Sequence, residues 1–597
     1  MLLNKLSYIH LLFLALLFAF LLKGCKWEEK SQANEWLWNP QSLENLPEQH
    51  LALIGAAWLE KNGIVNSPNG KQIIHWECWV SHEPLKLKKE IPEVKPKNAI
   101  EVELPHKQLP ANSVIYFETY LEIKDPSYLF IRPDDGAHLY VNDEKKTSVM
   151  PDVFRLETSE TPQKITIRVI NNAMKGGLSD ARLVSEVSYM DFVKANEIKE
   201  KIYEIHEKAL RMSSFDSLVS HKLSVALTKP ISLQKLIEFE KKYLDFNLVY
   251  PGPWLQQNHQ DTIWVHWQQN DDFKTTIKYG WQGDLLTNEA LTFFSNEVYR
   301  APIILKSKKE VYYQMVNDDV KSDVYNIILP TDSVNILLWS DSQGGWEKYR
   351  KILNNYSEVS VHASIGLGDL VSNGSDEKQW KQFWNTSMPV ASKVPFHLIP
   401  GNHDYDGYYE NLTPDLFLRY TFNRPDYNYK SFTIGDACFL LLDPNAYFPV
   451  NIPSLSIQRQ FLDSMVTTDT WQSARWKIVG IHQPPYAQGW EGYEGEELLR
   501  PLIEELVKSY GADLILSGHN HCYEKSIKVI DGREVAFLVL GGAGGGLEST
   551  ANNSTPIMDK VIKEHHMALM TYDHSHLRIT VANEDGEEID FINLKKN

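Results

Sequence analysis

Five short polar motifs in the C-terminal half of the chain each follow an apolar run that is typical of a β-strand. Carboxyl ends of neighbouring strands in an open α/β sheet meet at one edge, so we expect the five motifs to share one site. The runs and motifs are NILLW before Ser340-Asp341-Ser342-Gln343, SIGL before Gly368-Asp369, PFHLIP before Gly401-Asn402-His403-Asp404, WKIVGI before His482, and ADLILS before Gly518-His519-Asn520-His521.

The side chains of these motifs are metal ligands by type. They offer carboxylate, amide and imidazole donors without a thiolate, a set that suits manganese, iron or zinc. The six candidates are Asp341, Asp369, Asn402, His482, His519 and His521, with Gln343 as a weaker seventh. Two metal ions about 3.5–4 Å apart can hold a bridging hydroxide and neutralise an in-line displacement at phosphorus. Any single motif could be a turn or a core histidine, but five in this order favour a metal site.

The region 333–597 resembles the calcineurin-like metallophosphoesterases, and GHNHCYEKS and LGGAGGG resemble the purple acid phosphatase branch. The resemblance implies a four-layer α/β/β/α sandwich and two divalent metal ions (Mn, Zn or Fe). It implies that Asp341, Asp369 and His521 hold one ion, and that Asn402, His482 and His519 hold the other, with Asp369 bridging. Two positions depart from the pattern and leave the metal identity open. Ser372 stands where the purple enzymes have tyrosine, and Gln343 stands where many relatives have histidine.

The GNHD motif also supplies catalytic candidates. Histidine is suited as a residue type to protonating a leaving alkoxide, so His403 is the expected general acid, and Asp404 is expected to orient it. Tyr486 and Tyr523 are predicted to line the pocket. The expected function is hydrolysis of phosphate esters, with phosphomonoesters as the expected substrates, by attack of a metal-bound hydroxide with His403 as general acid. A phosphodiesterase on the same core, and a surface-binding protein with a degenerate metal site, are the alternatives.

The 597 residues are enough for about three or four domains, and three further regions precede the metal motifs. Residues 36–188 alternate like the strands of a β-sandwich, and RPDDGAHLYVNDE resembles galactose-binding-like jelly rolls. A carbohydrate or surface ligand could stack there on Trp58, Trp76 or Trp79, although tryptophans in strands usually fill a core. Residues 191–245 have helical periodicity and are predicted to connect domains. Residues 246–330 resemble the fibronectin-III-like domain that precedes the catalytic domain of purple acid phosphatases.

The first 25 residues have the pattern of an export signal. Lys5 precedes the apolar stretch 11–22, and Leu22-Lys23-Gly24-Cys25 resembles a bacterial lipobox, which predicts acylation of Cys25. An uncleaved transmembrane anchor is the alternative. In both cases we expect an exported protein held at a membrane or cell surface, on the periplasmic or extracellular face. The net charge of −18 argues against a nucleic-acid-binding surface.

Overall fold

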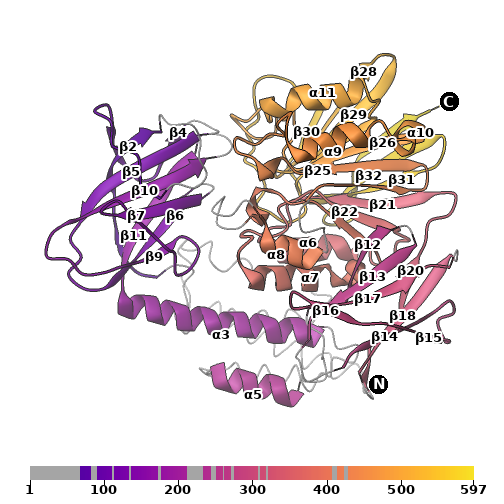
Figure 1. Cartoon of the computed structure of the whole chain (residues 1–597), viewed down its shortest axis with the longest axis horizontal. Helices are drawn as coiled ribbons and strands as arrows, with labels where there is room; N and C mark the ends of the chain where they lie inside the picture. The colour runs from indigo at the N-terminus through magenta and orange to yellow at the C-terminus, as the bar shows by residue number, and fades with distance from the viewer. Residues whose placement is uncertain are drawn as a thin grey trace, which may run out of the picture. The chain divides into compact units, whose positions relative to one another are not determined.

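The computed structural model describes most of the chain from residue 68 onward (Figure 1). The described residues are 68–81, 90–109, 113–133, 136–171, 176–210, 233–243, 251–259, 261–269, 274–306, 309–317, 320–405, 413–421 and 428–596. Cys25 and Trp58 lie outside these ranges, so the roles suggested for them stay predictions.

The first described region consists of two antiparallel sheets. Their orders are β1-β11-β6-β9, with β4 beside β11, and β3-β2-β5-β10-β7-β8. The strands are β1 (Lys71–Gln72), β2 (His75–Val80), β3 (Ile100–Glu103), β4 (His106–Leu109), β5 (Ser113–Leu121), β6 (Ser127–Pro133), β7 (Gly136–Val141), β8 (Glu144–Lys146), β9 (Val153–Leu156), β10 (Gln163–Asn171) and β11 (Gly176–Ser185). Alternate residues such as Phe117 and Ile167 face a shared hydrophobic core.

Two tryptophans of this region do not offer the sugar-stacking surface suggested by the sequence. Trp76 is 2% exposed and packs in the core between strands. Trp79 is 5% exposed and stacks on Tyr116, with ring centroids 5.2 Å apart. Both indoles are used in packing, so the prediction that they stack on carbohydrate is wrong.

Two helices and a second pair of sheets follow. The helices are α3 (Glu186–Leu210) and α5 (Leu233–Tyr243). None of the described helices combines the length and the apolar character that crossing a membrane requires. The sheets have the orders β12-β13-β17-β16 and β15-β14-β18-β19, with β20 beside β18. Their strands are β12 (Trp254–His259), β13 (Thr262–Trp267), β14 (Thr276–Gly280), β15 (Asn288–Ala290), β16 (Phe293–Ser295), β17 (Val298–Ile304), β18 (Glu310–Asn317), β19 (Val320–Lys321) and β20 (Tyr325–Ile328).

The C-terminal region contains a six-stranded and a seven-stranded sheet. The first has the order β23-β22-β21-β31-β32-β33 and the second β24-β25-β26-β27-β29-β28-β30. The strands of the first are β21 (Val334–Trp339), β22 (Ala363–Gly366), β23 (Phe396–Leu398), β31 (His566–Tyr572), β32 (His576–Asn583) and β33 (Glu588–Lys595). Those of the second are β24 (Lys430–Ile434), β25 (Ala437–Leu442), β26 (Trp476–Ile481), β27 (Leu514–Ser517), β28 (Tyr523–Ile530), β29 (Arg533–Leu540) and β30 (Lys560–Ile562).

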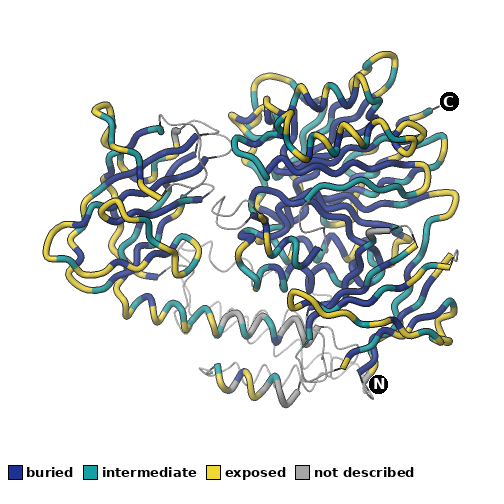
Figure 2. Tube along the Cα trace, viewed as in Figure 1, coloured by how far each residue is buried: buried dark blue, intermediate teal, exposed yellow. Residues whose placement is uncertain are grey.

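The two C-terminal sheets pack face to face and are covered by helices (Figures 1 and 2). Ile336 of the first sheet and Phe439 of the second belong to one buried core between them. The next residue along β21, Leu337, points to the opposite face, where it packs with α6 (Trp346–Asn354), α7 (Glu377–Ala391) and α8 (Asp415–Thr421). Leu440 points outward from the second sheet toward α9 (Ile457–Met465), α10 (Asp469–Ser473) and α11 (Arg500–Lys508). The result is the four-layer α/β/β/α arrangement.

The polar motifs lie where parallel strands of these two sheets end. Strands β21, β22 and β23 are parallel neighbours in one sheet, and β25, β26 and β27 are parallel neighbours in the other. Since both sets deliver their loops to one edge of the sandwich, residues far apart in sequence meet there.

Candidate active site

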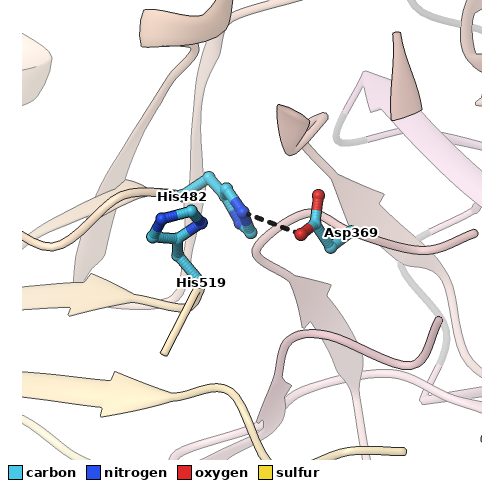
Figure 3. Close-up of side chains that lie close together, drawn as sticks. All are labelled: Asp369, His482 and His519. Carbon is cyan, nitrogen blue, oxygen red and sulfur yellow. Dashed lines mark ion pairs between the residues drawn. The ribbon is translucent and has the colours of Figure 1, made fainter. Parts of the chain in front are cut away.

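Three of the predicted ligands converge at this edge. Asp369 follows β22, His482 follows β26 and His519 follows β27, and one ligand atom from each lies within 4.8 Å of the others (Figure 3). Their side chains come from both sheets and are buried. The convergence of a carboxylate and two imidazoles in a buried position is the arrangement of a metal site.

The hydrogen bonds of the histidines leave ligand atoms available. Nδ1–H of His482 donates to the carbonyl oxygen of Leu367 at 2.8 Å, so in the neutral ring Nε2 is the atom that a metal ion can bind. That Nε2 lies 3.3 Å from Oδ2 of Asp369. Nε2 of His519 is also buried, and it has no hydrogen-bond partner among the described residues. An unpaired buried polar atom costs about 1–3 kcal/mol, and a cation bound by Nε2 of His519 would remove that cost.

A second group of predicted ligands lies around His521. Its Nε2 is 3.5 Å from Oδ1 of Asp341, and its Nδ1–H donates to the carbonyl oxygen of Gly546 at 2.6 Å. Nε2 of Gln343 lies 3.0 Å from the same imidazole Nε2. Gly545, which precedes Gly546 in the sequence, packs directly on the His521 ring. A Cβ built at Gly545 would be 2.8 Å from Cε1 of His521. The glycine-rich stretch therefore holds this imidazole in place.

The backbone of the ligand loops is strained. Asp341, Asp369 and His519 have φ values of 63°, 51° and 69°, which residues with a Cβ seldom adopt. Hydrogen bonds between loops hold them there: the backbone N–H of His519 donates to the Asp341 carboxylate at 2.9 Å, and that of His403 donates to Oδ1 of Asp369 at 2.9 Å. Strain of this kind persists where the surrounding structure fixes it, and it concentrates at functional sites.

The charges of the cluster depend on one another. Burial alone would raise the pKa of Asp369, but His482 and His403 outweigh it and lower that pKa. Burial likewise opposes the charged form of His482, yet Asp369 raises the pKa of this imidazole to about 9. Burial and then the charge of His482 lower the pKa of His519 well below its usual value. Asp369 and His482 thus share one proton, and a bound cation would displace that proton.

The structure corrects the role of Asp404. Its carboxylate accepts backbone N–H groups from Leu370 at 2.9 Å, Val371 at 3.2 Å and Gly401 at 2.9 Å. The ring of His403 instead meets the carbonyl oxygen of Ser372, 3.1 Å from Nδ1. Asp404 is buried in the η2 turn (Asn402–Asp404) and joins two ligand loops, so the prediction that it orients His403 is wrong.

The two predicted substrate tyrosines lie elsewhere. Tyr486 belongs to the cluster under the outer helices, and its hydroxyl donates to Glu504 at 2.9 Å. Tyr523 is fully buried between the two sheets, and its hydroxyl donates to Asp590 at 2.6 Å. The Tyr486 ring packs against the core under the outer helices and Tyr523 points between the sheets, so the prediction that they line the pocket is wrong.

Two aromatic residues that the sequence interpretation missed lie beside the proposed ligand His519. The rings of Trp490 and Tyr493 lie 5.5 Å and 5.4 Å from the ring of His519. Their loop is anchored by Glu524, whose carboxylate accepts backbone N–H groups from Gln488 and Gly489 and also the Asn520 amide. The signal for Glu524 was a carboxylate at the start of a strand; the loop sequence itself carried no signal.

Comparison with known proteins agrees with this geometry. Residues 334–523 match the family model described as calcineurin-like phosphoesterase. This part of the chain resembles a calcineurin-like phosphoesterase domain. The phosphoesterase domain contains all the predicted metal ligands, and its family resemblance, drawn above from the motifs, is confirmed.

Relatives of this domain are plant purple acid phosphatases. Purple acid phosphatase 15 of Arabidopsis thaliana is 28% identical over 179 residues, which are 28% of this chain and 33% of that protein. Probable inactive purple acid phosphatase 24 of the same plant is 25% identical over 214 residues, covering 30% of this chain and 34% of that protein. The chain thus spans about a third of the length of these relatives. A purple acid phosphatase structure from yellow lupin (Lupinus luteus) seeds covers 81% of this chain and 93% of its own, with a TM-score of 0.50 and 15% identity, and shows a shared fold.

Proposed function

We propose that this protein is an exported phosphoesterase that uses two divalent metal ions to hydrolyse phosphomonoesters. The observation that carries the proposal is the convergence of Asp369, His482 and His519 within residues 334–523. Nε2 of His519 is buried and has no hydrogen-bond partner in the described part of the chain, and Nε2 of His482 lies 3.3 Å from Asp369. The relative purple acid phosphatase 15 is named for phosphatase activity.

The residues present fit two ions. We assign Asp341, Asp369 and His521 to one ion, and Asn402, His482 and His519 to the other, with Asp369 shared. Gln343, beside His521, is an additional ligand or a substrate contact. Manganese, zinc and ferrous iron all suit carboxylate, amide and imidazole donors. When bound, the ions would activate water and neutralise charge on the phosphoryl oxygens.

We propose that His403 supplies the leaving-group proton. In its charged form both ring nitrogens carry hydrogen, so Nδ1–H can donate to the Ser372 carbonyl and Nε2–H can donate to the leaving oxygen. Transfer from Nε2 leaves a neutral ring whose Nδ1–H bond to Ser372 is unchanged. The ring therefore keeps its orientation before and after the proton moves, which is what a general acid needs.

Substrate reaches the site from the side of the partly exposed residues. His403, Trp490 and His521 are each partly exposed, whereas Asp369 and His482 are buried. If an ester bound over the ligands, its leaving group would contact His403 and the Trp490 ring.

The test is a substrate comparison with the purified protein. We expect hydrolysis of p-nitrophenyl phosphate to exceed that of bis(p-nitrophenyl) phosphate, and Asp369→Asn to abolish it. The matched control is Asp513→Asn, a buried aspartate that binds Lys596 and Arg533. Preference for the diester would favour the phosphodiesterase alternative. Metal binding without hydrolysis of either ester would favour the surface-binding alternative.

Export and anchoring are part of the same proposal. They rest on the lipobox-like sequence that ends at Cys25. A carbohydrate or surface ligand for the N-terminal sheets rests only on the jelly-roll resemblance, with Trp76 and Trp79 excluded as stacking partners.

A further inference from the structure

A chain of buried side-chain amides ends at the proposed ligand Asn402. Asn445, in the turn after β25, donates its Nδ2–H to the carbonyl oxygen of Pro400 at 3.4 Å. Nε2 of Gln483 donates to Oδ1 of Asn445 at 2.5 Å and to Oδ1 of Asn402 at 3.4 Å. The three amide side chains are at most 4% exposed. This series of hydrogen-bonded amides joins loops from both sheets next to the site.

The carbonyl group of Pro400 determines the order of donors and acceptors among these three amides. A backbone carbonyl can only accept, so the amide group of Asn445 that faces Pro400 must be its NH₂ group. Oδ1 of Asn445 then faces Gln483, which must present its own NH₂ group. The second hydrogen of that group requires an oxygen from Asn402. The carbonyl of Pro400 thereby fixes which end of each amide points where.

The unused end of Gln483 agrees with this order. Its Oε1 is buried and has no hydrogen-bond partner among the described residues. Turning the amide over would place Oε1 against Oδ1 of Asn445, two acceptors at 2.5 Å, and would be worse than leaving Oε1 unpaired. The orientation of Gln483 is therefore imposed by its neighbours.

We propose that Gln483 and Asn445 are positioning residues that hold the amide of Asn402 with its oxygen available as a metal ligand. An asparagine binds a cation through oxygen and never through its NH₂ group, so a free amide would spend part of its time in the wrong orientation. An amide oxygen has two acceptor positions, and Gln483 occupies one of them. This inference rests on the proposed function, because it takes Asn402 as a ligand.

The test is a metal titration of the full protein, with dissociation constants for both ions. Gln483→Leu should weaken one of the two sites by about 10–100-fold, the usual effect of removing a residue that orients a ligand. The control is Gln268→Leu, because Gln268 is also buried and makes two hydrogen bonds, to Glu297 and Tyr420, in another region. That variant should leave both constants unchanged. Equal dissociation constants in Gln483→Leu and wild type would overturn this inference and leave the proposed function standing. A wild-type protein that binds no metal would overturn the proposed function and this inference with it.

A second variant separates orientation from general support. Asn402→Asp has oxygen at both ends of the side chain, so its orientation no longer matters. In that background Gln483→Leu should weaken the site by less than about threefold. A loss as large as in the wild-type background would show that Gln483 only supports the fold and would contradict the inference. If Gln483→Leu does not fold, Gln483→Glu is the substitute, since its carboxylate repels both amide oxygens and should weaken the same site; unchanged constants would again overturn the inference.

Discussion

Nδ1 of His403 lies 3.1 Å from the backbone carbonyl oxygen of Ser372. Ser372 is the position where the purple enzymes have tyrosine, as the family resemblance implies. Because the contact uses the backbone of residue 372, the side chain there can differ without altering the orientation of the His403 ring. The orientation of the proposed general acid, His403, therefore does not depend on whether residue 372 is tyrosine or serine.

Replacement of His403 tests its role as general acid. We expect His403→Asn to retain its metal content and to lose about 10²–10⁴-fold in turnover of an alkyl phosphate, since general acid catalysis typically contributes that much. The loss should be smaller for p-nitrophenyl phosphate, whose leaving group needs little protonation. His574→Asn, at an exposed histidine, is the control. An unchanged rate on the alkyl ester would remove His403 from the mechanism.

The glycine-rich stretch offers a matched pair of variants. A Cβ at Gly545 would lie 2.8 Å from Cε1 of His521, whereas a Cβ at Gly546 would meet nothing within 4 Å. We therefore expect Gly545→Ala to displace the imidazole and weaken metal binding by at least about 10-fold, as displaced ligands do. Gly546→Ala should bind metal like wild type. Metal titration of both proteins checks this, and equal affinities would show that the ring does not depend on Gly545.

The ligand positions could be predicted from sequence because they combine two local signals. Asp369, His482 and His519 each follow an apolar run, and strand ends in an α/β sheet converge whatever the exact packing. The alternation of Leu337 and Ile336 between two cores likewise follows from the two-residue period of a strand. Family motifs then supplied the choice of chemistry.

The errors concern directions of side chains that no local pattern determines. Asp404 and His403 are adjacent, but the tight turn sends the carboxylate inward to three N–H groups and leaves the imidazole at the site. Tyr523 begins a strand, and its position along the pleat points it between the sheets. Trp490 reaches His519 through a loop held by Glu524, a contact that depends on tertiary structure alone.

Acid should destabilise the protein through His566. Burial lowers the pKa of this imidazole to about 4, so it folds uncharged, while the unfolded residue has a pKa near 6.5. Because the folded pKa is the lower one, the contribution to stability is complete above about pH 6.5 and is lost as the pH falls toward 4.

His566→Asn keeps an N–H group for the carbonyl of Glu564, which Nδ1 of His566 contacts at 2.8 Å, but cannot titrate. Between pH 7 and pH 5 we expect its free energy of unfolding to fall by about 2 kcal/mol less than that of wild type. Urea titrations at the two pH values, followed by tryptophan fluorescence, measure the difference. Equal falls in both proteins would contradict a neutral buried His566.

Substitution of Cys25 tests the lipid anchor. Acylation of this residue would add more than one chain, and stable anchoring needs at least two such signals. We expect Cys25→Ala to move the protein from the membrane fraction to the soluble fraction and to abolish labelling by a fatty-acid probe. A wild-type protein without label would show that the apolar segment 11–22 acts as the anchor or is removed without acylation.

Metal content measured together with activity tests the central claim most directly. We predict two divalent ions per chain by elemental analysis and a colourless solution, since Ser372 supplies no phenolate for charge transfer to ferric iron and the hydroxyl of Tyr405 is bound to Asp443 at 2.6 Å. Chelation should abolish ester hydrolysis, and added manganese, zinc or ferrous iron should restore it. A protein that hydrolyses phosphate esters at the full rate after its metals are removed, or that binds none, would contradict the account.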